Sequence, residues 1–137
     1  MAVPVADLIA QAQSGALSLN ADPAAFVALE KTMTERMQRI SIIQQDIRMV
    51  AEQETWGLGE ASAVLTSAQT LVRRFREKAD SGPNNAVTAL ESHLVAAEEM
   101  LSLFRTIRQR YEETDAAFAA RFKELAVAQG LDIGGNP

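Results

Sequence analysis

The sequence predicts an all-α protein, a long antiparallel helical hairpin with a broken second arm, and three observations lead to it. Residues that favour helix (Ala, Leu, Glu, Gln, Arg and Met) are frequent, while aromatic residues make up only 5% of the chain. No alternating run of Val, Ile, Thr and Tyr bounded by turn residues indicates a strand. Over two long segments, apolar residues recur at steps of three and four, as they do along one face of a helix.

Residues 1–21 form an N-terminal segment ahead of the hairpin. Apolar residues at helical spacing predict a short helix between Val3 and Gln13, ended by Ser14-Gly15, and residues 16–20 are expected to be an extended connection. The segment has no basic start and carries Asp7 in its apolar part, so it does not fit a Sec-type signal peptide. No uncharged run approaches the roughly 20 residues needed to span a bilayer.

The first arm of the hairpin is predicted over residues 23–54. Asp22-Pro23 is a helix start, because Asp accepts hydrogen bonds from the first free amides and Pro loses nothing at the first helical position. Glu30 is assigned to the solvent side of this helix. At 1.5 Å per residue the arm would be about 48 Å long, which requires a partner helix of similar length. Its apolar stripe consists of Phe26, Leu29, Met33, Met37, Ile40, Ile43, Ile47 and Val50.

The second arm is predicted over residues 60–129, with a break near residues 80–85. Gly82 and Pro83 disfavour a straight helix and the Asn pair after them offers a new N-cap, so the break is either a kink or a short loop. The arm ends at Gln129-Gly130, and residues 130–137 are expected to be a flexible tail. Beyond the break the apolar residues follow a heptad, with Arg108 and Asp115 as polar exceptions: Val87, Leu90, Leu94, Ala97, Leu101, Phe104, Tyr111, Phe118, Phe122 and Leu125.

The hairpin domain, residues 22–129, would leave much of its two apolar stripes exposed to water. A second hairpin is the natural remedy, which predicts a four-helix bundle formed by two chains, either a homodimer or a heterodimer with a paralogous hairpin protein. In the alternative, the N-terminal segment and the break let the chain fold back and cover its own stripes as a monomer.

The tip of the hairpin lies between the arms, in the stretch Glu54–Glu60. It holds the only Trp of the chain, Trp56, which is expected to cap the hairpin core with a large apolar side chain. Gly57 and Gly59 are expected to supply the unusual backbone angles of a tight turn.

A second short signal, Tyr111 and Asp115, lies late in the second arm. Residues four apart share a helix face, so the Tyr hydroxyl and the Asp carboxylate are predicted to be displayed together. Asp115 falls on the apolar heptad, where a carboxylate is unexpected. Arg108 is expected to pair with Glu112 on the helix surface.

A helical hairpin with an aromatic-glycine tip, no Sec signal and a Tyr-x-x-x-Asp element resembles the WXG family of type VII secretion substrates, the Esx and Esp-like proteins of actinobacteria and some other Gram-positive bacteria. The resemblance covers about residues 22–129, although Leu58 stands where the Trp-x-Gly tip of the family has Gly. It implies that Trp56 and Gly59 form the tip and that Tyr111 and Asp115 belong to the export signal. It also implies that the tip of one chain and the signal of its partner form a surface that a secretion ATPase recognises.

The function expected from this resemblance is that of a secreted or cell-envelope-associated, non-enzymatic protein that acts through protein–protein contacts. The alternative is a cytoplasmic helical-bundle adaptor or scaffold that is not exported. A membrane-active hairpin is disfavoured, because the polar faces are mixed in charge and not rich in Lys and Arg. The net charge of -5 argues against a nucleic-acid partner.

An enzyme is the class that the sequence favours least. There is no nucleophile–base pairing, no phosphate-binding glycine loop and no metal-ligand spacing, so no catalytic, cofactor-binding or metal residue is predicted. The sole histidine, His93, lacks acidic neighbours at ligand spacing, and the absence of cysteine excludes disulfides and thiolate metal sites.

Overall fold

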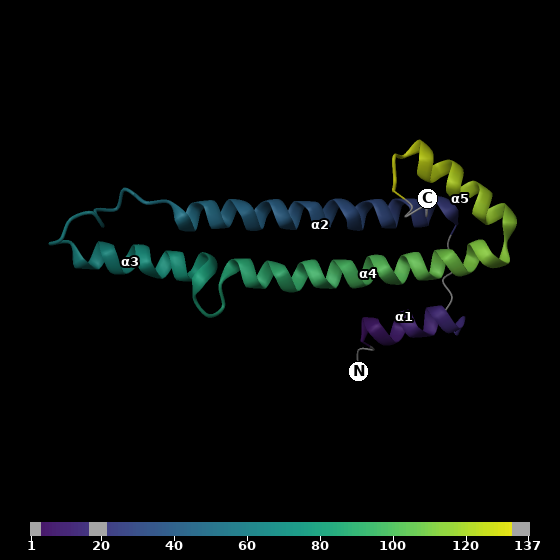
Figure 1. Ribbon diagram of the computed structural model, residues 1–137, viewed down its shortest axis with the longest axis horizontal. Helices are drawn as coiled ribbons and strands as arrows, with labels where there is room; N and C mark the ends of the chain where they lie inside the picture. Colours follow the sequence, from purple (N-terminus) through teal and green to yellow (C-terminus); the bar gives the residue numbers. More distant parts are fainter. Residues whose placement is uncertain (1–3, 17–21, 133–137) are drawn as a thin grey trace. The chain divides into compact units, whose positions relative to one another are not determined.

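The computed structural model describes residues 4–16 and 22–132 (Figure 1). All regular structure in this part of the chain is helical, so the predicted all-α class is confirmed. The chain divides into two compact units, each with its own packing: unit 1 contains the described residues up to Met37 and from Ala96 onward, and unit 2 is Gln38–Val95. In chain order the elements are α1 (Val5–Ser14), α2 (Pro23–Glu52), α3 (Thr66–Arg76), the π-helix η1 (Glu77–Ser81), α4 (Ala86–Thr114) and α5 (Ala116–Ala128).

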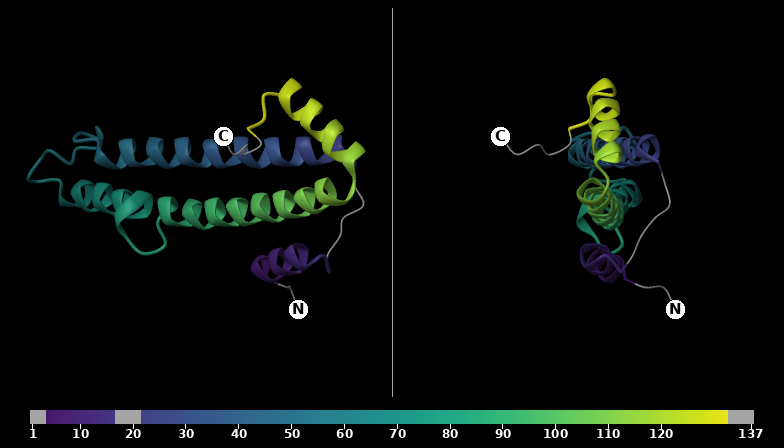
Figure 2. Two further views of the ribbon diagram at one scale, coloured as in Figure 1. Left: turned by 45° about the vertical axis from the view of Figure 1, so that its right-hand side comes forward. Right: turned by 90° about the vertical axis from the view of Figure 1, so that its right-hand side faces the viewer.

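Unit 1 is built on the first half of α2 and the second half of α4, which run antiparallel. Phe26 lies beside Tyr111, whereas Glu30, one turn later in α2, pairs with Arg108, one turn earlier in α4. Within this unit α1 lies alongside α4 and α5 folds back over the start of α2 (Figure 2). The buried core that joins all four helices consists of Ala12, Phe26, Val27, Ile107, Phe118, Phe122 and Ala126.

The first two helices of unit 1 begin and end close to where the sequence predicts. The short N-terminal helix is present as α1 and ends at Gly15, whose φ of 80° is left-handed. Asp22 caps α2, because the amide of Ala25 donates to its Oδ1 at 2.8 Å. The predicted helix start at Asp22-Pro23 is therefore confirmed. The predicted extended connection and the predicted C-terminal tail lie largely outside the described residues.

The C-terminal part of the second arm differs from the prediction of one continuous helix. That prediction is wrong, because α4 ends at Thr114 and a separate helix, α5, begins at Ala116. Asp115 between them has extended backbone angles (φ -140°, ψ 102°), and its carboxylate accepts a hydrogen bond from the amide of Phe118 at 3.1 Å. The carboxylate that interrupts the apolar heptad is thus the N-cap of a new helix. The change of direction lets Phe118 and Phe122 join the core of unit 1.

Unit 2 contains the second half of α2, α3, η1 and the start of α4. Buried Gln44 of α2 donates from Nε2 to the carbonyl oxygen of Val87 at 3.2 Å and to Oε2 of Glu91 at 3.0 Å. These two bonds fix the register of α2 against α4 within this unit. The predicted first arm, residues 23–54, corresponds to α2 and ends two residues earlier than expected, at Glu52.

The predicted break near residues 80–85 is a π-helical turn followed by a loop. Asn85 caps α4, since the amide of Thr88 donates to its Oδ1 at 2.7 Å and its own Nδ2 donates to the carbonyl oxygen of Gly82 at 2.8 Å. The Asn pair therefore does supply the predicted N-cap, and the break is a loop instead of a kink. The predicted start of the second arm at residue 60 is wrong, because residues 60–65 belong to the tip loop and α3 begins at Thr66.

Candidate functional site

The tip loop of unit 2 has the backbone that its glycines predict. Gly57 and Gly59 have φ angles of 75° and 95°, which L side chains rarely adopt, so the unusual backbone angles expected of both residues are confirmed. The expected tight turn is wrong, because residues 53–65 form a longer loop between α2 and α3. A Cβ atom at Gly59 would lie 2.9 Å from Cδ1 of Leu65, but this is the end of an exposed side chain that can move aside, so the positive φ is what favours glycine here. Trp56 is half-buried and stacks on Phe75 of α3, with ring centroids 5.9 Å apart. The aromatic residue therefore packs the loop onto α3.

Glu60 organises this loop, a role that is not predicted from the sequence. Its carboxylate accepts hydrogen bonds from three successive backbone amides, those of Trp56, Gly57 at 3.2 Å and Leu58 at 2.9 Å. Successive amides that converge in this way form an anion-binding concavity, which here holds a carboxylate of the same chain. The hydrogen bond from the Trp56 amide is the largest cause that lowers the pKa of Glu60 below its usual value of 4.5. An acidic residue directly after the two glycines was the available sequence signal.

We expect the tip loop to lose its order at acidic pH. Because the folded-state pKa of Glu60 is depressed, its stabilising contribution is complete above its unfolded pKa of about 4.5 and is lost as the pH falls through the lower folded value. The fluorescence of Trp56, the only Trp of the chain, reports this change directly. Glu60→Gln should remove the acid transition and show already at neutral pH the spectrum that the unaltered chain adopts in acid. An identical titration curve for both proteins would contradict the assignment.

Tyr111 and Asp115, the predicted export signal, lie at the junction of α4 and α5 in unit 1. Tyr111 is half-buried, and its ring packs against Phe118 and Phe26 at centroid distances of 5.2 and 5.9 Å. Asp115 is exposed and extended, so the prediction that the two side chains share one helix face is wrong. Their common role in this structure is to join α5 to α4, Tyr111 through ring packing and Asp115 through the cap. Trp56 belongs to unit 2, and the predicted composite surface between two chains stays a prediction.

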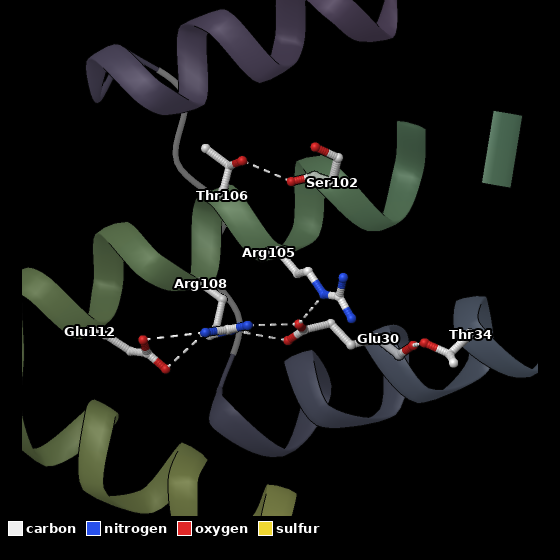
Figure 3. A network of polar contacts seen from close by, with 7 residues as sticks. All are labelled: Glu30, Thr34, Ser102, Arg105, Thr106, Arg108 and Glu112. Carbon is white, nitrogen blue, oxygen red and sulfur yellow. Dashed lines mark hydrogen bonds and ion pairs between the residues drawn. The ribbon is translucent and has the colours of Figure 1, made fainter. Parts of the chain in front are cut away.

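A buried cluster of charges lies next to this junction (Figure 3). Glu30 of α2 is fully buried, so its assignment to the solvent side is wrong. Arg108 binds it with two hydrogen bonds, from Nη2 to Oε1 at 2.9 Å and from Nε to Oε2 at 3.2 Å. Nε of Arg105 lies 3.5 Å from the same Oε1. Arg108 also pairs with Glu112 at 3.3 Å, which confirms the expected i, i+4 contact.

The surroundings of Arg108 explain why a guanidinium is tolerated at an apolar heptad position. Burial by itself lowers the pKa of Arg108, but hydrogen bonding and attraction to Glu30, and then to Glu112, outweigh burial and raise the pKa overall. Phe122 of α5 covers the guanidinium with its ring, whose centroid lies 4.5 Å from Cζ. The cluster therefore holds α2, α4 and α5 in register, and the arginines neutralise the buried carboxylate of Glu30.

Unit 1 also has a surface groove of about 290 Å³ between the start of α2 and the end of α5. Its walls are mainly aliphatic, and Nζ of Lys31 donates to Oε1 of Gln129 at 3.4 Å across them. The groove is lined by Ala24, Val27, Ala28, Lys31, Thr32, Glu35, Leu125 and Gln129.

Across residues 4–16 and 22–132, no group of three or more His, Cys, Asp or Glu side chains is placed to hold a metal ion. The same residues include no helix with the length and apolarity to cross a bilayer.

The two candidate sites are thus the tip loop around Trp56 and Glu60 and the capped junction around Tyr111 and Asp115. Comparison of the chain with protein-family models, with curated proteins and with solved structures finds no match in any of the three.

Proposed function

We propose that this chain is a non-enzymatic helical protein that acts through protein–protein contacts after export by a type VII (ESX-like) secretion system. The observation that carries the protein-contact part is the exposure of apolar side chains in unit 2. Of the twelve large hydrophobic residues that are exposed in the described part of the chain, ten lie in this unit. They are Ile42, Ile43, Met49, Val50, Leu58, Val64, Leu65, Leu71, Phe75 and Val95.

The arrangement of these residues on α2 supports a partner helix. Ile42 and Met49 are seven residues apart, so they lie on one side of the helix, and Gln44, which is buried in unit 2, points to the opposite side. In this unit α2 therefore exposes a second apolar strip in addition to the face that it buries. Exposed apolar side chains that gather on one part of a protein are a common mark of an interaction site. A second copy of this chain or a paralogous helical hairpin fits it, as in the four-helix bundle expected from the sequence.

The export part of the proposal rests on the resemblance of the tip and of Tyr111 with Asp115 to the WXG family. Under this proposal, the type VII secretion ATPase is a second partner of the protein. The protein is secreted or remains with the cell envelope, without use of a Sec signal peptide. Both residues also stabilise the α4–α5 junction, so truncation to alanine would mix two effects. Asn at position 115 keeps a capping oxygen, and Phe at position 111 keeps the ring packing.

Export should therefore be measured with Tyr111→Phe and Asp115→Asn in a host that carries a type VII system. If the phenol hydroxyl and the carboxylate are read by the secretion machinery, both variants should accumulate in the cells at the expense of the medium. Thermal unfolding of each variant, measured alongside, distinguishes loss of the signal from loss of stability. Export of both variants at parental levels would remove these residues from the signal. A parent protein that stays in the cell fraction would favour the cytoplasmic adaptor instead.

A further inference from the structure

The sequence between Ala86 and Ala128 supports one uninterrupted helix, although the structure divides it at Asp115. The segment contains neither Gly nor Pro. Its heptad runs through the division without a change of phase, since Tyr111 and Phe118 on either side of Asp115 are seven residues apart. The same apolar side chains can therefore form the seam of a continuous helix or the buried face of a helix that folds back.

The folded-back arrangement is held by contacts that α5 makes with α2 and α4 of unit 1. Phe118 packs against Phe26 with ring centroids 5.8 Å apart, and Phe122 covers Arg108. Phe122 and Ala126 are both fully buried. At the division itself, the carboxylate of Asp115 caps the Phe118 amide, and the amide of Asp115 donates to the carbonyl oxygen of Tyr111 at 2.9 Å.

We propose that α5 exchanges between two copies of this chain. In the exchanged dimer α4 and α5 form one helix through Asp115, and α5 of each copy covers Phe26 and Arg108 of the other. Reciprocal exchange of an identical element is a low-cost route to a dimer, because the packing that is broken within each chain forms again between the two chains. A one-residue hinge favours it further, since short hinges invite exchange.

The surface under α5 identifies a second copy as the occupant. It combines an aromatic patch, Phe26 and Tyr111, with the guanidinium of Arg108, and these groups fit the rings of Phe118 and Phe122. A second α5 offers these same side chains at the same spacing. The inference goes beyond the proposed function, because it places a contact between two copies at α5 of unit 1 and not at the exposed apolar residues of unit 2.

Two substitutions at the hinge separate helix continuity from loss of the cap. Asp115→Ala and Asp115→Gly both remove the carboxylate, but only Ala favours a continuous helix. The dimer dissociation constant is measured by size-exclusion chromatography with light scattering over a concentration series. It should be on the order of 20-fold lower for the Ala variant than for the Gly variant, because the preference of a helix for Ala over Gly counts at both hinges of the dimer. Asp115→Asn, which keeps a capping oxygen, should behave like the parent. Equal dissociation constants for the Ala and Gly variants would overturn the proposal.

A cross-link distinguishes the exchanged dimer from pairing through unit 2. Lys31 of α2 and Gln129, directly after α5, are in hydrogen-bond contact, and the chain has no cysteine of its own. The two substitutions Lys31→Cys and Gln129→Cys are introduced into the Asp115→Ala protein. A short bismaleimide should then link position 31 of one chain to position 129 of the other in the dimer fraction, and link these positions only within one chain in the monomer fraction. A dimer that is linked only within each chain would reject exchange of α5 and leave pairing through unit 2 intact.

Discussion

Replacing Arg108 with alanine should lower the free energy of unfolding by about 3–5 kcal/mol, the cost of leaving a buried charge without its partner. Glu30 is fully buried, and its carboxylate receives both of its hydrogen bonds from Arg108. Arg105 cannot replace this partner well, because its Nε lies 3.5 Å away and 38% of its side chain is exposed. The loss should be visible as a lower midpoint in urea unfolding followed by circular dichroism.

Two controls belong with this measurement. Arg110→Ala removes the exposed ion pair with Glu113 and should cost at most about 1 kcal/mol. Replacing both buried partners, Glu30→Leu with Arg108→Met, should recover much of the lost stability, because apolar residues of similar volume need no charge partner. An Arg108→Ala protein as stable as Arg110→Ala would show that the buried pair does not hold unit 1 together.

Replacing Phe122 with alanine should also lower the free energy of unfolding by about 3–5 kcal/mol, as for other buried aromatic residues. The ring is fully buried, packs alongside Phe118 and covers the guanidinium of Arg108. Its loss opens a cavity under α5 and removes the cation–π contact at the same time. Thermal unfolding and urea unfolding of the variant measure the sum of both effects.

The two effects of Phe122 can be separated with a second residue. Phe122→Leu refills most of the cavity without restoring the π face, so it should recover part of the stability and leave Arg108 without its ring. Phe75→Ala provides the matched exposed control in unit 2, because Phe75 is 44% exposed. If Phe122→Ala costs no more than Phe75→Ala, α5 does not belong to the core of unit 1.

Several features of the fold could be predicted from the sequence because their causes are local. Asp22 and Asn85 cap the helices that follow them through hydrogen bonds to amides three residues away. Gly57 and Gly59 adopt positive φ angles inside the loop that they were expected to shape. In each case the residue type and its neighbours in the chain are enough to fix the geometry.

The features that could not be predicted depend on residues far apart in the chain. Glu30 lies at a position that also suits a solvated helix face, and only Arg108, 78 residues later, makes its burial possible. Asp115 fits both a continuous helix and a helix that ends and is followed by a capped one, because the heptad around it is the same in either case. What selects the cap is the packing of Phe118 and Phe122 on α2 and α4, which is a tertiary contact and not a local preference.

The uneven burial of apolar side chains determines which part of the chain unfolds locally at the lowest free energy. Of the twelve buried hydrophobic residues in the described part of the chain, nine lie in unit 1 and only Ile40, Val72 and Val87 lie in unit 2. Segments with few buried apolar groups open at a lower free energy than the global unfolding, so amide hydrogens of α3 should exchange with solvent well before those of α5. Protease cleavage should therefore begin between residues 53 and 85, and a partner bound to unit 2 would delay it.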